Sequence, residues 1–180
     1  MMSGGHNEEI DKRHIFMNDH YKLTSLLFKY ENSFNFVNEK IKTICSMAKI
    51  ENLFTTNSVD YNFQNFYDMK NVDQMITSLI IYTMECIDVL DNRLLVQEKQ
   101  ILNLQNIIYN NRYICEVITM RNVVFNYNDI GGNSIISGCN IQFFMNSILG
   151  RLNGFSDRYK IMFCNISKLE KRVRLNYRIK

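Results

Sequence analysis

The residue types that most often carry out catalysis are few in this sequence and form no recognisable set. All three histidines, His6, His14 and His20, fall within the first 20 residues. His14 and His20 are six positions apart, which does not place them on one face of a helix, so they do not indicate a metal site. The rest of the chain therefore has no histidine to serve as the base of a Ser-His-Asp or Cys-His arrangement.

Acidic residues and cysteines give no stronger sign of chemistry. In residues 112–180, the acidic residues Glu116, Asp129, Asp157 and Glu170 are too scattered for a two-metal nuclease. The five cysteines show no CxxC or CxH spacing, which indicates free thiols in a reducing compartment rather than a zinc knuckle or a disulfide framework. The stretch 129–134 lacks the Lys-Ser/Thr of a phosphate-binding loop and predicts a turn. We therefore expect a non-enzymatic protein that uses no cofactor and no metal.

The basic C-terminal end is the clearest functional signal in the sequence. Residues 151–180 contain nine Lys or Arg and only two acidic residues, a local net charge of +7, whereas the preceding part of the chain carries −4. A cluster of cations of this kind binds phosphate backbones in a salt-dependent way, so DNA or RNA is the expected partner. The candidate nucleic-acid-binding residues are Arg151, Arg158, Lys160, Lys168, Lys171, Arg172, Arg174, Arg178 and Lys180.

Three other interpretations of the same charges stay open at this stage. The cations could protect an edge strand from aggregation by their mutual repulsion. They could instead form salt bridges with the acidic part of the same chain. A third alternative is an anionic surface on a protein or a membrane.

Two segments with heptad patterning would have to position this basic end. In the first, apolar residues alternate at spacings of four and three over residues 23–48, which predicts a helix from about residue 19 to residue 50. These residues are Leu23, Leu27, Tyr30, Phe34, Val37, Ile41, Ile44 and Ala48. The second segment follows the same alternation from Ile76 to Ile108, with polar residues only at Thr83 and Gln97. Each segment predicts a long helix with one apolar stripe.

The two stripes are compatible with two architectures. The helices could fold back on each other as an antiparallel hairpin, or they could pair across subunits in an oligomeric coiled coil. We favour a homodimer, because Leu79, Leu95 and Ile107 widen the second stripe beyond what one partner helix would cover. The candidate oligomerisation residues are Ile76, Ile80, Ile87, Leu90, Leu94, Ile101, Leu104 and Ile108.

The segment between the two predicted helices, residues 51–71, is rich in Asn and aromatic residues. It is too long for a tight helical turn, and long loops are often functional. The aromatic cluster at 54–67 could bind a protein partner or stack on bases. The alternative is that these rings pack back onto the helix pair.

Beyond residue 111 the spacing of apolar residues changes to about two, which predicts strands at 112–120, 123–127, 159–164 and 171–180. A buried helix is expected at 139–152 and ends before Gly154. The predicted fold class is α+β, mostly α. A flexible N-terminus (1–18) precedes a helical region (19–111), and a small basic ββαβ-like module (112–180) follows.

Composition places the chain in a broad class. The excess of Asn, Ile, Lys and Tyr indicates an AT-rich genome, viral or protozoan, and the absence of proline permits long helices. The polar N-terminus is unlike a signal peptide, and no apolar run is convincing as a membrane span, so we expect an intracellular protein with no membrane partner, in the cytoplasm or nucleus of a host cell if it is viral. The predicted function is an oligomeric assembly protein that presents its basic end to nucleic acid. The alternative is a structural or regulatory scaffold that binds only proteins.

Overall fold

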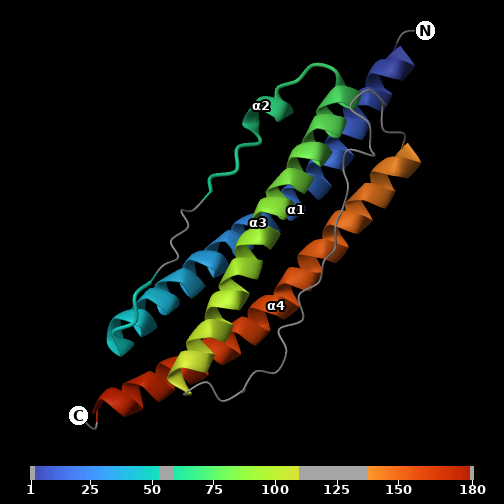
Figure 1. Ribbon diagram of the computed structural model, residues 1–180. Helices are drawn as coiled ribbons and strands as arrows, with labels where there is room; N and C mark the ends of the chain where they lie inside the picture. The colour runs from blue at the N-terminus through green and yellow to red at the C-terminus, as the bar shows by residue number, and fades with distance from the viewer. Residues whose placement is uncertain (1–2, 53–58, 110–137, 179–180) are drawn as a thin grey trace. The chain divides into compact units, whose positions relative to one another are not determined.

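The computed structural model describes residues 3–52, 59–109 and 138–178. Four helices make up nearly all of these residues, and no strand occurs among them: α1 (Ser3–Ala48), α2 (Gln64–Tyr67), α3 (Val72–Ile108) and α4 (Gly138–Arg178) (Figure 1). The chain divides into two compact units, and each long helix contributes to both. Of the described residues, the first unit comprises 3–29, 60–88 and 138–152, and the second comprises 30–52, 59, 89–109 and 153–178.

The heptad stripes of α1 and α3 contribute much of the apolar core of the two units. Every residue of the first predicted stripe is buried except Ala48, and every residue of the second is buried except Ile108. Burial of a large aliphatic or aromatic side chain contributes about 1.5–3 kcal/mol, so these stripes account for the two long helices. Sequence periodicity thus predicted both helices and their buried faces.

The helices do not form an antiparallel hairpin. In the first unit Lys12 contacts Asp73 and His20 contacts Thr83, so residue numbers rise together along α1 and α3. In the second unit Glu31 pairs with Arg93, and Asn38 with Gln97, in the same order. Within each unit these two helices therefore run in the same direction. Heptad spacing alone cannot specify this direction, because parallel and antiparallel helix pairs have the same spacing of apolar residues.

The prediction of a C-terminal ββαβ module is wrong. Residues predicted as strands at 159–164 and 171–178 lie within the single helix α4. This helix has its own stripe with spacings of three and four, and every member is buried: Met145, Ile148, Leu152, Phe155, Tyr159, Met162, Ile166, Leu169 and Val173. Burial of nine such side chains outweighs the strand propensity of short local stretches. The predicted strands at 112–120 and 123–127 and the predicted turn lie outside the described residues.

Gly154 does not end a helix, as its position after an apolar run had suggested. The helix continues through it, and a Cβ at Gly150 or Gly154 would meet nothing within 4 Å beyond the adjacent residues and the backbone of its own helix. A glycine inside a helix costs about 1 kcal/mol relative to alanine. Burial of the apolar side chains on both sides of Gly154 stabilises the helix by more than this cost. The packing of α4 therefore accommodates both glycines, but it does not require a residue without a side chain at either position.

The ends of α1 differ from the predicted ends. The helix begins at Ser3 rather than near residue 19, because Phe16 and His20 extend the buried stripe toward the N-terminus. It ends in a Schellman motif, in which the Ile50 amide donates to the Cys45 carbonyl at 2.8 Å and the Lys49 amide donates to the Ser46 carbonyl at 3.4 Å. Lys49 has a φ of 57°, the left-handed conformation that this motif requires.

In the first unit, two α1 side chains hold the segment that contains α2. His20 is buried and contacts the Tyr67 hydroxyl at 2.7 Å and Thr83 Oγ1 at 2.8 Å. The Thr83 hydroxyl donates to the Leu79 carbonyl, so His20 Nε2 donates to Thr83 and Nδ1 accepts from Tyr67. Burial lowers the pKa of His20 to about 4, which keeps the ring neutral.

Arg13 provides the second attachment of that segment. Its guanidinium donates to the carbonyls of Tyr67 and Met69, at 3.1 and 2.7 Å. The aromatic rings of the segment turn inward: Tyr61 and Phe63 are buried, while Phe66 and Tyr67 are half-buried. These contacts favour the alternative in which the rings of 54–67 pack onto the helices, while Phe54 lies outside the described residues.

In the second unit, several buried polar side chains of α1 and α3 form hydrogen bonds with one another. Arg93 donates two hydrogen bonds to Glu31, at 2.9 and 3.0 Å, and the side chains of both are less than one-tenth exposed. Its guanidinium also stacks on Phe34, 3.6 Å from the ring centroid. Gln97 donates to the Phe34 carbonyl and to Asn38. The polar heptad position 97 therefore has partners inside one chain.

Candidate nucleic-acid interface

The predicted cations lie on two different sides of α4. Successive residues of an α-helix are about 100° apart around its axis, so residues two apart point to nearly opposite sides. The buried stripe fixes one side of α4 against its neighbours in each unit. Cations near the edge of that stripe point toward α3, and the others point toward solvent.

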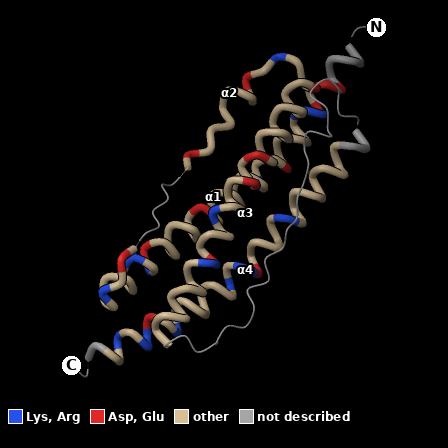
Figure 2. The backbone as a smooth tube through the Cα atoms, in the orientation of Figure 1, with Lys and Arg blue, Asp and Glu red and all other residues tan. Residues whose placement is uncertain are grey.

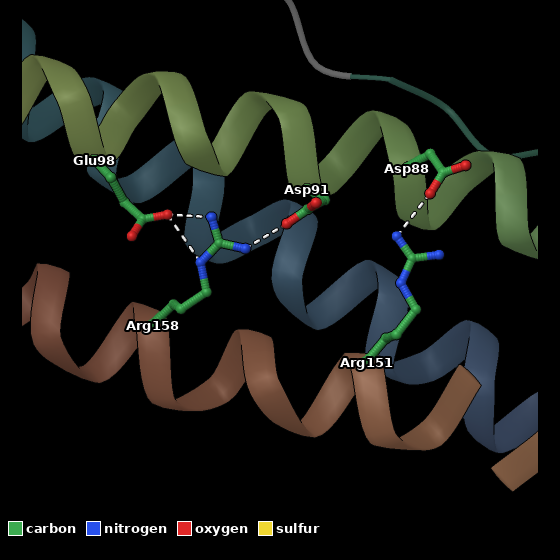
Figure 3. Close-up of polar contacts among 5 residues, drawn as sticks. All are labelled: Asp88, Asp91, Glu98, Arg151 and Arg158. Atoms are coloured by element: carbon green, nitrogen blue, oxygen red, sulfur yellow. Dashed lines mark hydrogen bonds and ion pairs between the residues drawn. The ribbon is translucent and has the colours of Figure 1, made fainter. Parts of the chain in front are cut away.

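Arg158 lies on the inward side. It binds both Asp91 and Glu98 of α3, with its Nε 2.8 Å from Glu98 Oε1 (Figure 3). Burial raises the pKa of Glu98, and the hydrogen bond from Arg158 opposes that rise. Burial also works to lower the pKa of Arg158, but the two carboxylates more than compensate and raise it. Arg158 is therefore committed to a pair of internal carboxylates.

Arg151, in the first unit, is committed in the same way. Its Nη2 lies 2.6 Å from Asp88 Oδ1 of α3, and the arginine side chain is one-tenth exposed (Figure 3). Arg151 and Arg158 thus match one of the alternatives raised by the sequence, salt bridging to the acidic part of the same chain. Neither side chain is available to a phosphate in this arrangement.

Among the α4 residues whose side chains the structure describes, five cations are exposed on the outward side of the helix. We call them the α4 basic face: Lys160, Lys168, Lys171, Arg172 and Arg174. At 1.5 Å per residue they extend along about 21 Å of helix. Figure 2 shows Lys and Arg recurring along the C-terminal half of α4. Five of the nine predicted cations therefore share the outward side of a helix, whereas the sequence had suggested a strand for several of them, and their binding to nucleic acid stays a prediction.

Contacts at both edges of the α4 basic face orient its side chains. Arg174 donates to Glu170 at 2.8 Å, and Glu170 also pairs with Lys40 of α1 at 2.9 Å. These hydrogen bonds lower the pKa of Glu170, so its carboxylate stays charged. On the other edge, the Arg172 guanidinium lies 4.9 Å from the ring centroid of Tyr109. The exposed apolar residues Ile161 and Leu175 lie on the same outward side as the cations.

The remaining predicted site residues fall elsewhere. Arg178 ends α4, and Lys180 lies outside the described residues. The candidate oligomerisation residues Ile76, Ile80, Ile87, Leu90, Leu94, Ile101 and Leu104 are buried within one chain, and Ile108 is half-buried. Of the residues that widen the second stripe, Leu79 is buried, Leu95 is half-buried and Ile107 is exposed. Dimerisation stays a prediction, and it would require a surface other than the stripe.

Comparison with known proteins adds no assignment. No family model, no curated protein and no solved structure matches this chain. Among the residues that the structure describes, no helix is long and apolar enough to cross a membrane. In the same residues, no three His, Cys, Asp or Glu side chains come together in a group that could hold a metal ion.

Proposed function

We propose that this protein is a non-enzymatic nucleic-acid-binding protein that contacts the phosphate backbone through the α4 basic face. The observation that carries the proposal is the presence of five exposed cations on one side of fifteen consecutive helical residues, Lys160–Arg174. The opposite side of the helix is held in the core, so the cations are presented on a rigid support. Affinity would come from charge, without preference for a base sequence.

The proposal predicts a steep dependence of binding on salt. If all five cations neutralise phosphates of a single strand, raising the salt from about 50 to about 200 mM should weaken binding roughly 100-fold. Fluorescence anisotropy with labelled single- and double-stranded oligonucleotides at the two salt concentrations measures this change directly.

A variant in which all five residues of the α4 basic face are changed to Gln should lose this binding. The matched control changes five exposed lysines outside α4 to Gln: Lys22, Lys42, Lys49, Lys70 and Lys99. Both variants lose the same positive charge, so their affinities for the oligonucleotide should differ only if the α4 basic face is the binding surface. Equal loss of affinity in the two variants would contradict the proposal.

A second candidate function is a scaffold that binds proteins. The exposed Ile161 and Leu175, 48% and 58% accessible, favour it because contact with phosphates does not need apolar side chains on the same helix face. Absence of oligonucleotide binding at low salt would favour the scaffold over the nucleic-acid interface.

A further inference from the structure

A groove in the first unit has an apolar floor and an acidic rim. It encloses about 380 Å³ between the N-terminal part of α1, the start of α3 and the start of α4. Its floor includes the buried side chains of Phe16, Ile76 and Met145. Ile15, at the edge of the groove, is 68% exposed, which is a large exposure for an isoleucine in a folded unit. The groove is therefore an apolar surface that is accessible to solvent.

Three carboxylates line the rim of this groove: Glu8, Asp11 and Asp19. All three are exposed, and none forms an ion pair with another residue in the described part of the chain. The one cation in the lining, Lys12, pairs with Asp73 at 2.5 Å, so it does not neutralise the rim. Among the described residues, the groove thus combines apolar area with negative charge that no ion pair neutralises.

The outward side of α4 in the second unit has the complementary chemistry. Ile161, Lys168 and Leu175 follow one another at intervals of seven residues, so they form a line along the helix. Both apolar members are about half exposed, and Lys171 and Arg172 flank the line. Such a helix face would place aliphatic side chains on an apolar floor while its cations meet carboxylates on the rim.

We infer that the groove of one copy binds the α4 basic face, with Ile161 and Leu175, of a second copy. The contact joins two different surfaces, so each copy that uses its groove still has a free α4 face, and each copy that uses its face still has a free groove. Repetition of such a contact gives either open chains or closed rings, and the smallest ring is a pair of copies in which each groove binds the other copy's α4 basic face. Self-association should therefore grow with protein concentration and weaken as salt rises, because charges on both surfaces contribute.

Two charge-reversed variants of the full chain test this contact. The groove variant carries Glu8→Lys, Asp11→Lys and Asp19→Lys, and the face variant carries Lys168→Glu, Lys171→Glu and Arg172→Glu. Each variant by itself brings like charges together at the contact and should raise the Kd of self-association about 100-fold or more. In an equimolar mixture the two variants have complementary surfaces, so association should return. Sedimentation velocity at low salt measures all four samples, including the unmodified protein.

Several results would overturn the inference. The unmodified protein could stay monomeric at low salt at the highest concentration that remains in solution. Either variant alone could associate as strongly as the unmodified protein, or the mixture could fail to regain association although circular dichroism shows both variants to be helical. The groove variant keeps its α4 basic face, so its oligonucleotide binding separates this inference from the proposed function. Loss of self-association with retained oligonucleotide binding supports the inference independently.

Discussion

Arg158 and Lys160 are two positions apart on α4 and have opposite surroundings. The Arg158 side chain is 12% exposed and binds two carboxylates of α3, whereas Lys160 is exposed on the other side of the helix. The net charge of a segment counts both residues equally. Their roles differ because a step of two residues turns the side chain to nearly the opposite side of a helix. Inward cations of α4 are expected to determine stability, and outward cations to determine binding.

Substitution within the buried ion pair between Arg93 and Glu31 should have the largest effect on stability. Replacing Arg93 with Met leaves the Glu31 carboxylate buried without its charge partner, which should cost about 3–5 kcal/mol of the free energy of unfolding. The double variant E31L/R93M removes both charges and should recover most of that loss. Urea denaturation measures each value. A double variant as unstable as the single one would contradict this account.

Arg158→Met should have the next largest effect and should depend on pH. The change leaves Glu98, whose side chain is 2% exposed, without its cation, at a cost of about 2–4 kcal/mol near neutral pH. Burial without the arginine raises the folded-state pKa of Glu98 further, so the folded state binds the proton more tightly than the unfolded state. The penalty should therefore shrink as the pH falls through that raised pKa.

Lys160→Met is the matched control for the inward arginine. This substitution removes one exposed cation from the same helix and should change the free energy of unfolding by no more than about 0.5 kcal/mol. Comparison of the two variants by thermal and urea unfolding isolates the inward contacts. Equal destabilisation would remove the distinction between the two sides of α4.

His20 should have a smaller effect on the free energy of unfolding, because its buried imidazole ring is neutral in the folded state. Its pKa is about 4 in the folded state against 6.5 in the unfolded chain, so the unfolded state binds more protons between these values. Stability should therefore be complete above the unfolded pKa and fall by about 2 kcal/mol between pH 7 and pH 5. Unfolding midpoints of the unmodified protein and of His20→Gln across this range measure the contribution. His14→Gln, which alters an exposed histidine of the same helix, is the matched control for the substitution.

Sequence patterns predicted α1 and α3 because their apolar stripes are nearly free of polar residues. The stripe of α4 was missed although its spacing is equally regular, since Gly154 and short runs of strand-forming residues suggested breaks. Local propensity is weaker than the burial of a continuous stripe, and the structure shows which effect dominates. His20 was missed for a related reason: it occupies a position of the α1 stripe, between Phe16 and Leu23, where apolar residues are expected.

The candidate interface could be predicted only as a set of cations. Treating 171–180 as a strand placed Arg172, Arg174 and Arg178 on a single face. In the helix, Arg172 approaches Tyr109 while Arg174 approaches Glu170, on the two edges of the outward side. The acidic partners of Arg151 and Arg158 lie about 60 residues away in sequence, and no local pattern identifies them.

The shared direction of the helices within each unit has a consequence for how the chain folds. The contacts Lys12–Asp73, Glu31–Arg93 and Arg158–Glu98 join residues that are 61, 62 and 60 positions apart. Helices joined by tight turns would begin to pack through residues close in sequence, but these contacts each require a loop of about 60 residues to close first. Folding rates fall as the mean sequence separation of contacts grows. This protein should therefore reach its native state more slowly than an antiparallel bundle of equal length and stability.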